Sequence, residues 1–328
     1  MKSRVTLQHI ADHCGFSKSM VAQVIRNPEG CLAKAQTKSI ILDTAKKFNY
    51  RSNMIAKGLS LQKSYTIGVL LPALSNDFYS DMIAEIQHLL STTDYSPVFS
   101  FWETEEGIQK AVDNILSRQV DAIITCEPSY IPDNLDIPVV SYYNQDDRFD
   151  FVGYNASNAI KDCLTYLIKL GHKKIGYIGI PTDQRFKAFQ MHMKDMELEY
   201  CSEWVVCNRN LGTFLAGTQA FTQIWQNKTQ PTAILTINDA VAIGAIRKAW
   251  EIGIKIPEKL SIIGFDDTPQ ANFCIPSLTS VNISSKKSVA STLLQMVFSR
   301  LKGTHVNRKV TILEHQLIIR ESCIKPKK

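Results

Sequence analysis

The stretch HIADHCGFSKSMVAQVI, residues 9–25, contains two short helical patterns separated by Gly15. Gly15 supplies the backbone freedom that a tight turn between two helices needs. Ser17 suits the N-cap of the second helix because its hydroxyl can accept a hydrogen bond from an exposed backbone N–H. Apolar residues keep i, i+3, i+4 spacing in that helix: Val21, Val24 and Ile25. The stretch predicts a helix-turn-helix, and an ordinary helical hairpin within a larger core is the alternative.

Positive charge is concentrated around this stretch. Residues 1–63 contain eleven Lys and Arg against three Asp and Glu, a net charge of +8. The rest of the chain holds the remaining 26 of the 37 basic residues and 28 of the 31 acidic residues, a net charge of −2. A small basic unit attached to a near-neutral body favours a polyanionic partner for that unit. The charge distribution therefore favours the DNA-binding interpretation.

A third helical pattern at 36–48 completes a three-helix unit, and residues 49–64 have the polar, small-residue composition of a linker. From Tyr65 onward, short β-branched runs alternate with helical patterns, which predicts parallel sheets covered on both faces. The alternation restarts after Gly171, so we expect two similar α/β lobes with a ligand cleft between them. The expected domains are a helix-turn-helix at 1–50, a hinge at 51–63 and a two-lobed body at 64–328.

The expected elements of the body follow the two sets. Strands are expected at 66–72, 97–101, 121–125, 138–142 and 151–154, and then at 173–181, 203–207, 232–236 and 260–266. Helices are expected at 78–90, 105–118, 187–198, 214–226 and 239–252. Near the end, 278–283, a helix around 286–301 and 310–322 have the pattern of a crossover followed by closing strands.

Composition and motifs argue against several classes of protein. Eight cysteines lie without CxxC or metal-ligand spacing, which indicates reduced thiols in a cytoplasmic protein and no metal or other cofactor. We expect no membrane partner, since the N-terminus lacks a secretory pattern and no apolar run nears the ~18–20 residues that span a bilayer. GxGxxG, GxxxxGK[ST], GxSxG and HExxH are all missing, so we expect no enzyme. A sugar-binding protein without a role on DNA is the alternative, disfavoured by the basic unit.

Several motifs resemble those of one family in the right order. VTLQHIADHCGFSKSMVAQVIRN (5–27) is similar to the helix-turn-helix signature of the lactose-repressor (LacI/GalR) family, and YRSNMIAKGL (50–59) is similar to its hinge. Further matches are IGVLLPALSNDFY (67–79), GHKKIGYIG (171–179), TAILTINDAVAIGAI (232–246), IPEKLSIIGFDD (256–267) and PSLTSV (276–281). The chain is identified as a member of that family. The resemblance implies a two-lobed α/β body like that of periplasmic sugar-binding proteins.

The resemblance also implies a homodimeric, sequence-specific transcriptional repressor that binds double-stranded operator DNA. Bases in the major groove would be contacted by Lys18, Ser19 and Gln23, and phosphates by Thr6, Ser17, Asn27 and Thr37. Hinge residues Asn53, Ala56 and Leu59 would contact the DNA, with Leu59 as a wedge in the minor groove, and packing of Leu59 on the body is the alternative. Met20 stands where the family usually has Thr, and either helix packing or contact with a thymine methyl suits it.

The effector implied by the resemblance is a small metabolite of carbohydrate metabolism, namely a sugar, sugar acid or sugar phosphate. Phe78 and Tyr79 would offer aromatic faces to its ring. Hydrogen bonds would come from Asn155, Arg185, Asn238 and Asp266, while Asp239 is expected to cap the helix that follows it. After residue 322 only CIKPKK remains, which cannot form an apolar heptad helix, so we expect assembly to stop at a dimer.

Overall fold

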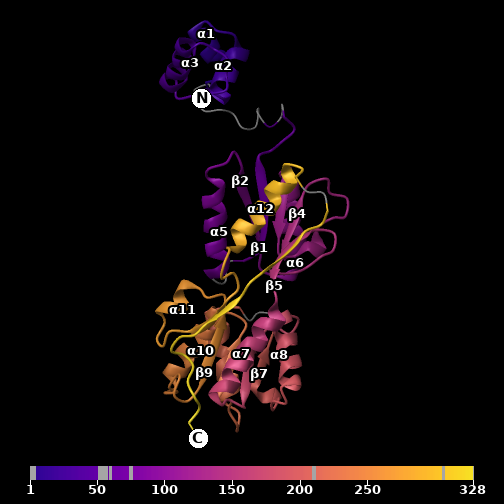
Figure 1. The fold of residues 1–328 in the computed structure, drawn as a ribbon, viewed down its shortest axis with the longest axis vertical. Coiled ribbons are helices and arrows are strands. Elements are labelled where there is room, and N and C mark those ends of the chain that lie inside the picture. The colour runs from indigo at the N-terminus through magenta and orange to yellow at the C-terminus, as the bar shows by residue number, and fades with distance from the viewer. Residues whose placement is uncertain are drawn as a thin grey trace. The chain divides into compact units, whose positions relative to one another are not determined.

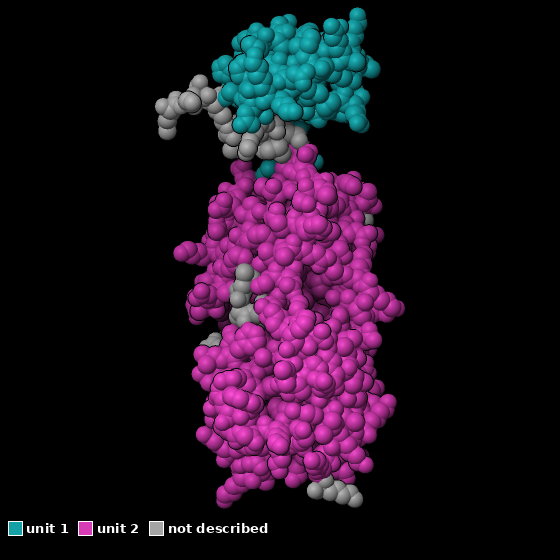
Figure 2. Space-filling view, turned by 90° about the vertical axis from the view of Figure 1, so that its left-hand side faces the viewer, with its two compact units in different colours: residues 1–64 teal, residues 65–328 magenta. Residues whose placement is uncertain are grey.

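The computed structural model describes residues 5–50, 58, 61–73, 77–208, 212–304 and 307–327. The chain divides into two compact units, Met1–Ser64 and Tyr65–Lys328 (Figure 2). The hinge residues predicted to contact DNA, Asn53, Ala56 and Leu59, lie outside the described residues.

The first unit packs α1 (Leu7–Cys14), α2 (Lys18–Arg26) and α3 (Ala35–Lys47) around a small core. Gly15 ends α1 in the left-handed region, at φ +71°, and its N–H donates to the Ala11 carbonyl. Ser17 caps α2 by accepting a hydrogen bond from the Met20 N–H at 3.2 Å. The core of the unit consists of Ile10, Ala11, Val21, Val24 and Ile41, all buried. The predicted helix-turn-helix is therefore confirmed, and its apolar spacing is what closes the core.

The second unit contains two six-stranded sheets, each the centre of one lobe (Figure 1). Lobe 1 has the strand order β11-β5-β4-β3-β1-β2 and lobe 2 the order β12-β10-β9-β8-β6-β7. The strands of lobe 1 are β1 (Thr66–Pro72), β2 (Ser96–Trp102), β3 (Ala122–Thr125), β4 (Val139–Tyr142), β5 (Asp150–Tyr154) and β11 (Val310–Leu313). Those of lobe 2 are β6 (Ile175–Gly179), β7 (Val205–Cys207), β8 (Ala233–Thr236), β9 (Ser261–Phe265), β10 (Thr279–Asn282) and β12 (Gln316–Ile318).

Helices cover both faces of each sheet, as the alternation predicts. Lobe 1 carries α5 (Asp77–Leu90), α6 (Glu105–Leu116), η1 (Pro128–Tyr130) and α12 (Val289–Leu301). Lobe 2 carries α7 (Ala156–Leu170), α8 (Gln184–Asp195), η2 (Ser202–Trp204), α9 (Phe214–Trp225), α10 (Asp239–Glu251) and α11 (Pro269–Phe273). Along β1, Val69 and Leu71 join the core that contains α5 and α12 residues, whereas Leu70 between them joins the core that contains α6 residues. Alternate side chains of a strand point to opposite faces, so a strand buried on both sides must be apolar throughout.

The chain passes between the lobes three times. It leaves lobe 1 after β5, returns between β10 and α12, and crosses again between β11 and β12 (Figure 1). β11 pairs in parallel with β5, and β12 pairs antiparallel with β10. The predicted crossover and closing strands near the C-terminal end are confirmed, and one closing strand goes to each lobe. No helix in the described part of the chain is long and apolar enough to cross a membrane.

Candidate DNA-binding face and effector cleft

The exposed face of α2 carries the residues predicted to contact bases. Lys18, Ser19 and Gln23 are all exposed, while Val21 and Val24 on the opposite face are buried in the core of the first unit. Met20 is 37% exposed and lies outside that core, so helix packing does not account for it. The exposed face of α2 is therefore polar except for the Met20 thioether, and it is accessible to a partner.

The residues predicted to contact phosphates lie at helix ends. Thr6 caps α1, and its hydroxyl and its backbone N–H both pair with His9. Ser17 caps α2, and its hydroxyl keeps its own hydrogen to donate. Asn27 follows α2, where its side-chain carbonyl accepts from the Gly30 N–H at 2.9 Å. Thr37 is half-buried in the first turns of α3.

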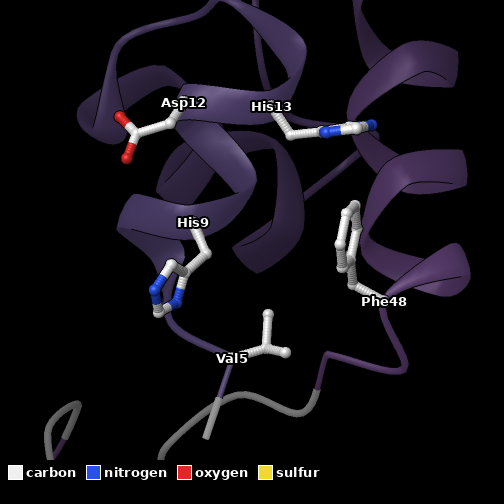
Figure 3. Close-up of a pocket in the computed structure, with 5 residues that line it drawn as sticks. All are labelled: Val5, His9, Asp12, His13 and Phe48. Atoms are coloured by element: carbon white, nitrogen blue, oxygen red, sulfur yellow. The ribbon is translucent and has the colours of Figure 1, made fainter. Parts of the chain in front are cut away.

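A shallow hollow of about 450 Å³ opens between α1 and the end of α3 (Figure 3). Its lining includes two histidines and an aspartate of α1: Val5, His9, Asp12, His13 and Phe48. The His13 ring meets the Phe48 ring edge-on, with 4.7 Å between centroids. The residues predicted to contact DNA do not line this hollow, and the described part of the chain holds no group of three side chains arranged to bind a metal ion.

In the second unit, Arg185 is the centre of a polar cluster between the lobes. Its Nε and one terminal nitrogen donate to the two carboxylate oxygens of Asp183, each at 2.9 Å, and the other terminal nitrogen donates to the Ile237 carbonyl at 2.6 Å. The side chains of Arg185 and Asp183 are only 12% and 6% exposed. Burial alone would raise the pKa of Asp183, but the adjacent guanidinium lowers it below its usual value. The pair is therefore ionised and internally neutral.

Aromatic rings from both lobes surround this pair. The Arg185 guanidinium lies 5.3 Å from the centre of the Tyr143 ring in lobe 1 and 5.5 Å from that of the Phe265 ring in lobe 2. The Tyr143 hydroxyl donates to Asp183 Oδ2 at 2.6 Å, so a hydrogen bond joins the lobes. Tyr154 lies between Tyr143 and Phe265, with centroid distances of 6.1 and 6.5 Å.

Phe78 and Tyr79 lie at the start of α5. Their rings meet edge-on at 5.4 Å, and Phe78 also stacks on Tyr142 at 6.0 Å. Burial and the neighbouring Cys126 raise the pKa of the Tyr79 hydroxyl well above its usual value, so it remains protonated and able to donate. These two predicted residues thus belong to the aromatic wall of lobe 1, which continues through Tyr142 to Tyr143.

Two of the predicted effector contacts serve as helix caps. The side-chain carbonyl of Asn155 accepts from the Asn158 N–H at the start of α7. The side-chain carbonyl of Asn238 accepts from the Val241 N–H at 2.9 Å, and its amide donates to the Gly212 carbonyl at 3.1 Å. The expectation that Asp239 caps α10 is wrong, because Asn238 occupies the N-cap and Asp239 is the first helical residue.

Asp239 lies close enough to Asp266 for the charge of Asp266 to raise its pKa. Asp239 accepts from the backbone N–H and hydroxyl of Thr268, at 2.7 and 3.1 Å, and from the Ser280 hydroxyl at 2.5 Å. Burial and then the Asp266 charge raise the pKa of Asp239 to about 8. Asp266 directly follows β9 at φ +100°, which is uncommon for a residue with a side chain, and burial raises its pKa to about 6.

A separate cavity of about 490 Å³ lies beside the first crossing between the lobes. Its lining comes from β5, β11 and the first turns of α7 and α8, and includes Asn155, Tyr154, Gln184 and Lys187. Of the predicted effector contacts, only Asn155 lines it. Asn155, which directly follows β5, lines this cavity together with Tyr154, whereas five predicted effector contacts do not line it: Arg185, Asp266, Asn238, Phe78 and Tyr79.

Sequence analysis missed Asp183, Tyr143 and Tyr154. Asp183 precedes α8 as its N-cap, and an Asp two residues before a predicted site arginine is a signal that could have found it. Tyr143 and Tyr154 each come at the end of a predicted strand, where ligand-binding residues of parallel sheets gather. Residues of the two lobes come together at this site only in the folded protein, and no local sequence pattern predicts these contacts.

The relatives that the sequence matches cover both the first and the second unit of the chain. Residues 164–323 match the family model of a periplasmic binding protein-like domain. The chain is 27% identical to the NTD biosynthesis operon regulator NtdR of Bacillus subtilis (strain 168), covering 97% of this chain and 99% of that protein. It is 25% identical to catabolite control protein A of Priestia megaterium, with the same coverage.

Solved structures share the whole fold. A lac repressor dimer bound to operator and the anti-inducer ONPF superposes with a TM-score of 0.84 at 21% identity, covering 98% of this chain and all of that one. The transcriptional regulator CelR in complex with cellobiose gives a TM-score of 0.70 at 19% identity, covering 97% and 100%. A helix-turn-helix unit joined to a two-lobed binding body defines the class of ligand-responsive DNA-binding proteins. Over almost its whole length, the chain is similar to these transcriptional regulators, and its fold is that of the lac repressor.

Proposed function

We propose that the protein represses transcription as a homodimer on a pseudo-palindromic operator, and that a sugar bound between the lobes sets its affinity for that operator. The observation that carries the proposal is the exposed face of α2, where Lys18, Ser19 and Gln23 project from a unit of net charge +8. A two-fold dimer places two such helices on half-sites one DNA turn apart.

The domain boundaries of the proposal are a DNA-binding domain at 1–50, a hinge at 51–63 and an effector domain at 64–328. The observed division after Ser64 supports them. We place the protein in the cytoplasm, with the DNA. The eight free cysteines suit a reducing compartment.

The inter-lobe cluster supports a sugar as effector. Arg185 and Asp266 offer hydrogen-bonding groups, and Tyr143, Phe265 and Phe78 offer ring faces, a combination that suits a hydroxylated ring. A ligand that contacts both lobes stabilises one relative arrangement of them, and its effect on DNA is set by its different affinity for the two states.

Fluorescence anisotropy tests the proposal. An operator selected from random duplexes by the full-length protein should bind far more tightly than scrambled duplex, and its affinity should fall steeply with salt because phosphate contacts release counterions. Leu59→Ala should reduce operator affinity and DNA bending if residue 59 is the minor-groove wedge. Failure to select any preferred sequence, with or without sugars, would contradict the proposal.

A further inference from the structure

The charge of the inter-lobe cluster limits which sugars it accepts. Arg185 is the cation expected to bind an anionic effector, but both carboxylate oxygens of Asp183 already pair with it. Asp183 accepts two further hydrogen bonds, from the Arg185 backbone N–H at 2.7 Å and from the Tyr143 hydroxyl at 2.6 Å. A carboxylate or phosphate would have to share a guanidinium that is already neutralised by a rigid partner.

Asp266 differs from the other described carboxylates of the cluster in its hydrogen bonding. Its backbone N–H donates to the Val281 carbonyl, but no described residue donates a hydrogen bond to its carboxylate. Of the described charges that act on its pKa, Arg185 lowers it and Asp183 raises it, and Arg185 already pairs with Asp183. Its neighbours differ: Asp267 pairs with Arg320 and Asn282, and Asp239 accepts three hydrogen bonds.

Two further features indicate that a ligand completes this site. Asp266 is held at φ +100°, a conformation that costs energy for a residue with a side chain. Tyr154 is 8% exposed, and its hydroxyl makes no hydrogen bond of good geometry with a described residue, although the Tyr143 hydroxyl lies near enough to lower its pKa. The Tyr154 hydroxyl is close enough to Arg185, Asp183 and Asp266 for their charges to act on it. Buried polar groups are normally paired, so both groups point to a bound molecule.

On the basis of the proposed function, we infer that the effector is an amino sugar, whose ammonium pairs with Asp266, and that sugar acids and sugar phosphates are excluded. One ammonium balances the one carboxylate that lacks a partner, and the ring hydroxyls can pair with Tyr154 and with the remaining N–H groups of Arg185. An anion would instead lie beside the Asp266 carboxylate with no free cation among the described residues of the cluster.

Charge-matched sugars test the inference on the full-length protein at about pH 7, where Asp266 is ionised and a sugar amine is largely protonated. The probes are glucose, galactose and mannose, each compared with its amino sugar, its N-acetylated amino sugar, its uronic acid and its phosphate. Thermal unfolding and titration calorimetry report binding. We expect the best ligand to be an amino sugar, with about tenfold or greater preference over its N-acetylated form, and no shift from the acids or phosphates.

Two variants test whether Asp266 causes the preference for the amino sugar over its N-acetylated form. Asp266→Asn should remove the preference for the amine over its N-acetylated form. Asp267→Asn, the matched control one residue later, should lower the unfolding temperature through loss of the Arg320 pair and keep that preference. An acid or phosphate as the best ligand of the wild-type protein would overturn the inference and leave the proposed function standing. An amine preference that persisted unchanged in Asp266→Asn would also overturn the inference and leave the proposed function standing. If no sugar of any charge altered either unfolding or operator binding, sugar control itself would be contradicted.

Discussion

The Tyr143 hydroxyl of lobe 1 donates a 2.6 Å hydrogen bond to Asp183 Oδ2 of lobe 2, and the same carboxylate neutralises Arg185. Tyr143 itself stands at φ +69°, a conformation uncommon for a residue with a side chain. The bond therefore joins the lobes at the point where the ligand is expected, and a ligand that displaced or strengthened it would change how firmly the lobes are held together.

Tyr143→Phe should remove this bond and keep the ring. Hydrogen bonds to charged groups contribute about 1.5–3 kcal/mol, so we expect the free energy of unfolding, measured with urea, to fall by an amount of that order. Tyr130→Phe is the control, because its hydroxyl meets Glu105 at 3.5 Å within lobe 1 and is solvent-exposed. An equal effect of both variants would show that the bond between the lobes has no special role.

Gln23→Ala should weaken binding to the selected operator by about 1–3 kcal/mol, because a Gln that pairs with a base edge discriminates by that amount. Affinity for scrambled DNA should change little. Gln8→Ala, on the exposed side of α1, is the control, since its side chain bonds to Asp12. Anisotropy with both duplexes decides the result. A loss of the same size on both would mean that Gln23 contacts phosphates only.

Stability should fall as pH rises from about 4 to about 8. Burial raises the pKa of Asp239 from 3.8 to about 8 and that of Asp266 from 3.8 to about 6. In this window the folded protein holds protons that the unfolded chain has lost, so raising the pH favours unfolding. Asp239→Asn should remove most of this slope and stabilise the protein at pH 8 by at least about 1 kcal/mol relative to wild type. Urea unfolding of both proteins across the window measures the difference, and parallel curves would contradict the assignment.

Phe273→Glu should weaken the homodimer. Phe273, at the end of α11, is 81% exposed and Ile275 beside it 91%, an arrangement that favours burial against a second copy. We expect the dissociation constant of the dimer to rise about tenfold or more in sedimentation experiments. Leu215→Glu on α9, 66% exposed, is the matched control and should leave the dimer intact. A dimer unaffected by Phe273→Glu would place the interface elsewhere.

Much of the architecture could be predicted from local pattern because parallel strands buried on both faces are continuously apolar. The run TIGVLLP at 66–72 coincides with β1, and the expected strand 151–154 misses β5 by one residue. The three-helix unit was predictable because Gly15 and Ser17 each have one evident role at a helix end.

The site was harder to predict because its geometry depends on contacts between distant residues. Arg185 was identified, but its pairing with Asp183 and its stacking on Tyr143, 42 positions earlier in the sequence, appear only once the lobes meet. The predicted N-cap of α10 is wrong by one residue, because Asn238 and not Asp239 occupies it and either residue type can cap a helix. The unpaired carboxylate of Asp266 has no signal in the sequence, because only the structure shows which donors reach the neighbouring Asp267.

The closing strands have a consequence for synthesis of the protein. β11 and β12, at residues 310–318, complete the edges of sheets whose first strands were made more than a hundred residues earlier. A growing chain on the ribosome therefore carries two unfinished lobes until almost all of it has been translated, whereas the three helices of the first unit emerge at the outset. A premature stop codon before residue 310 would strip an edge from both lobes and leave the helix-turn-helix intact.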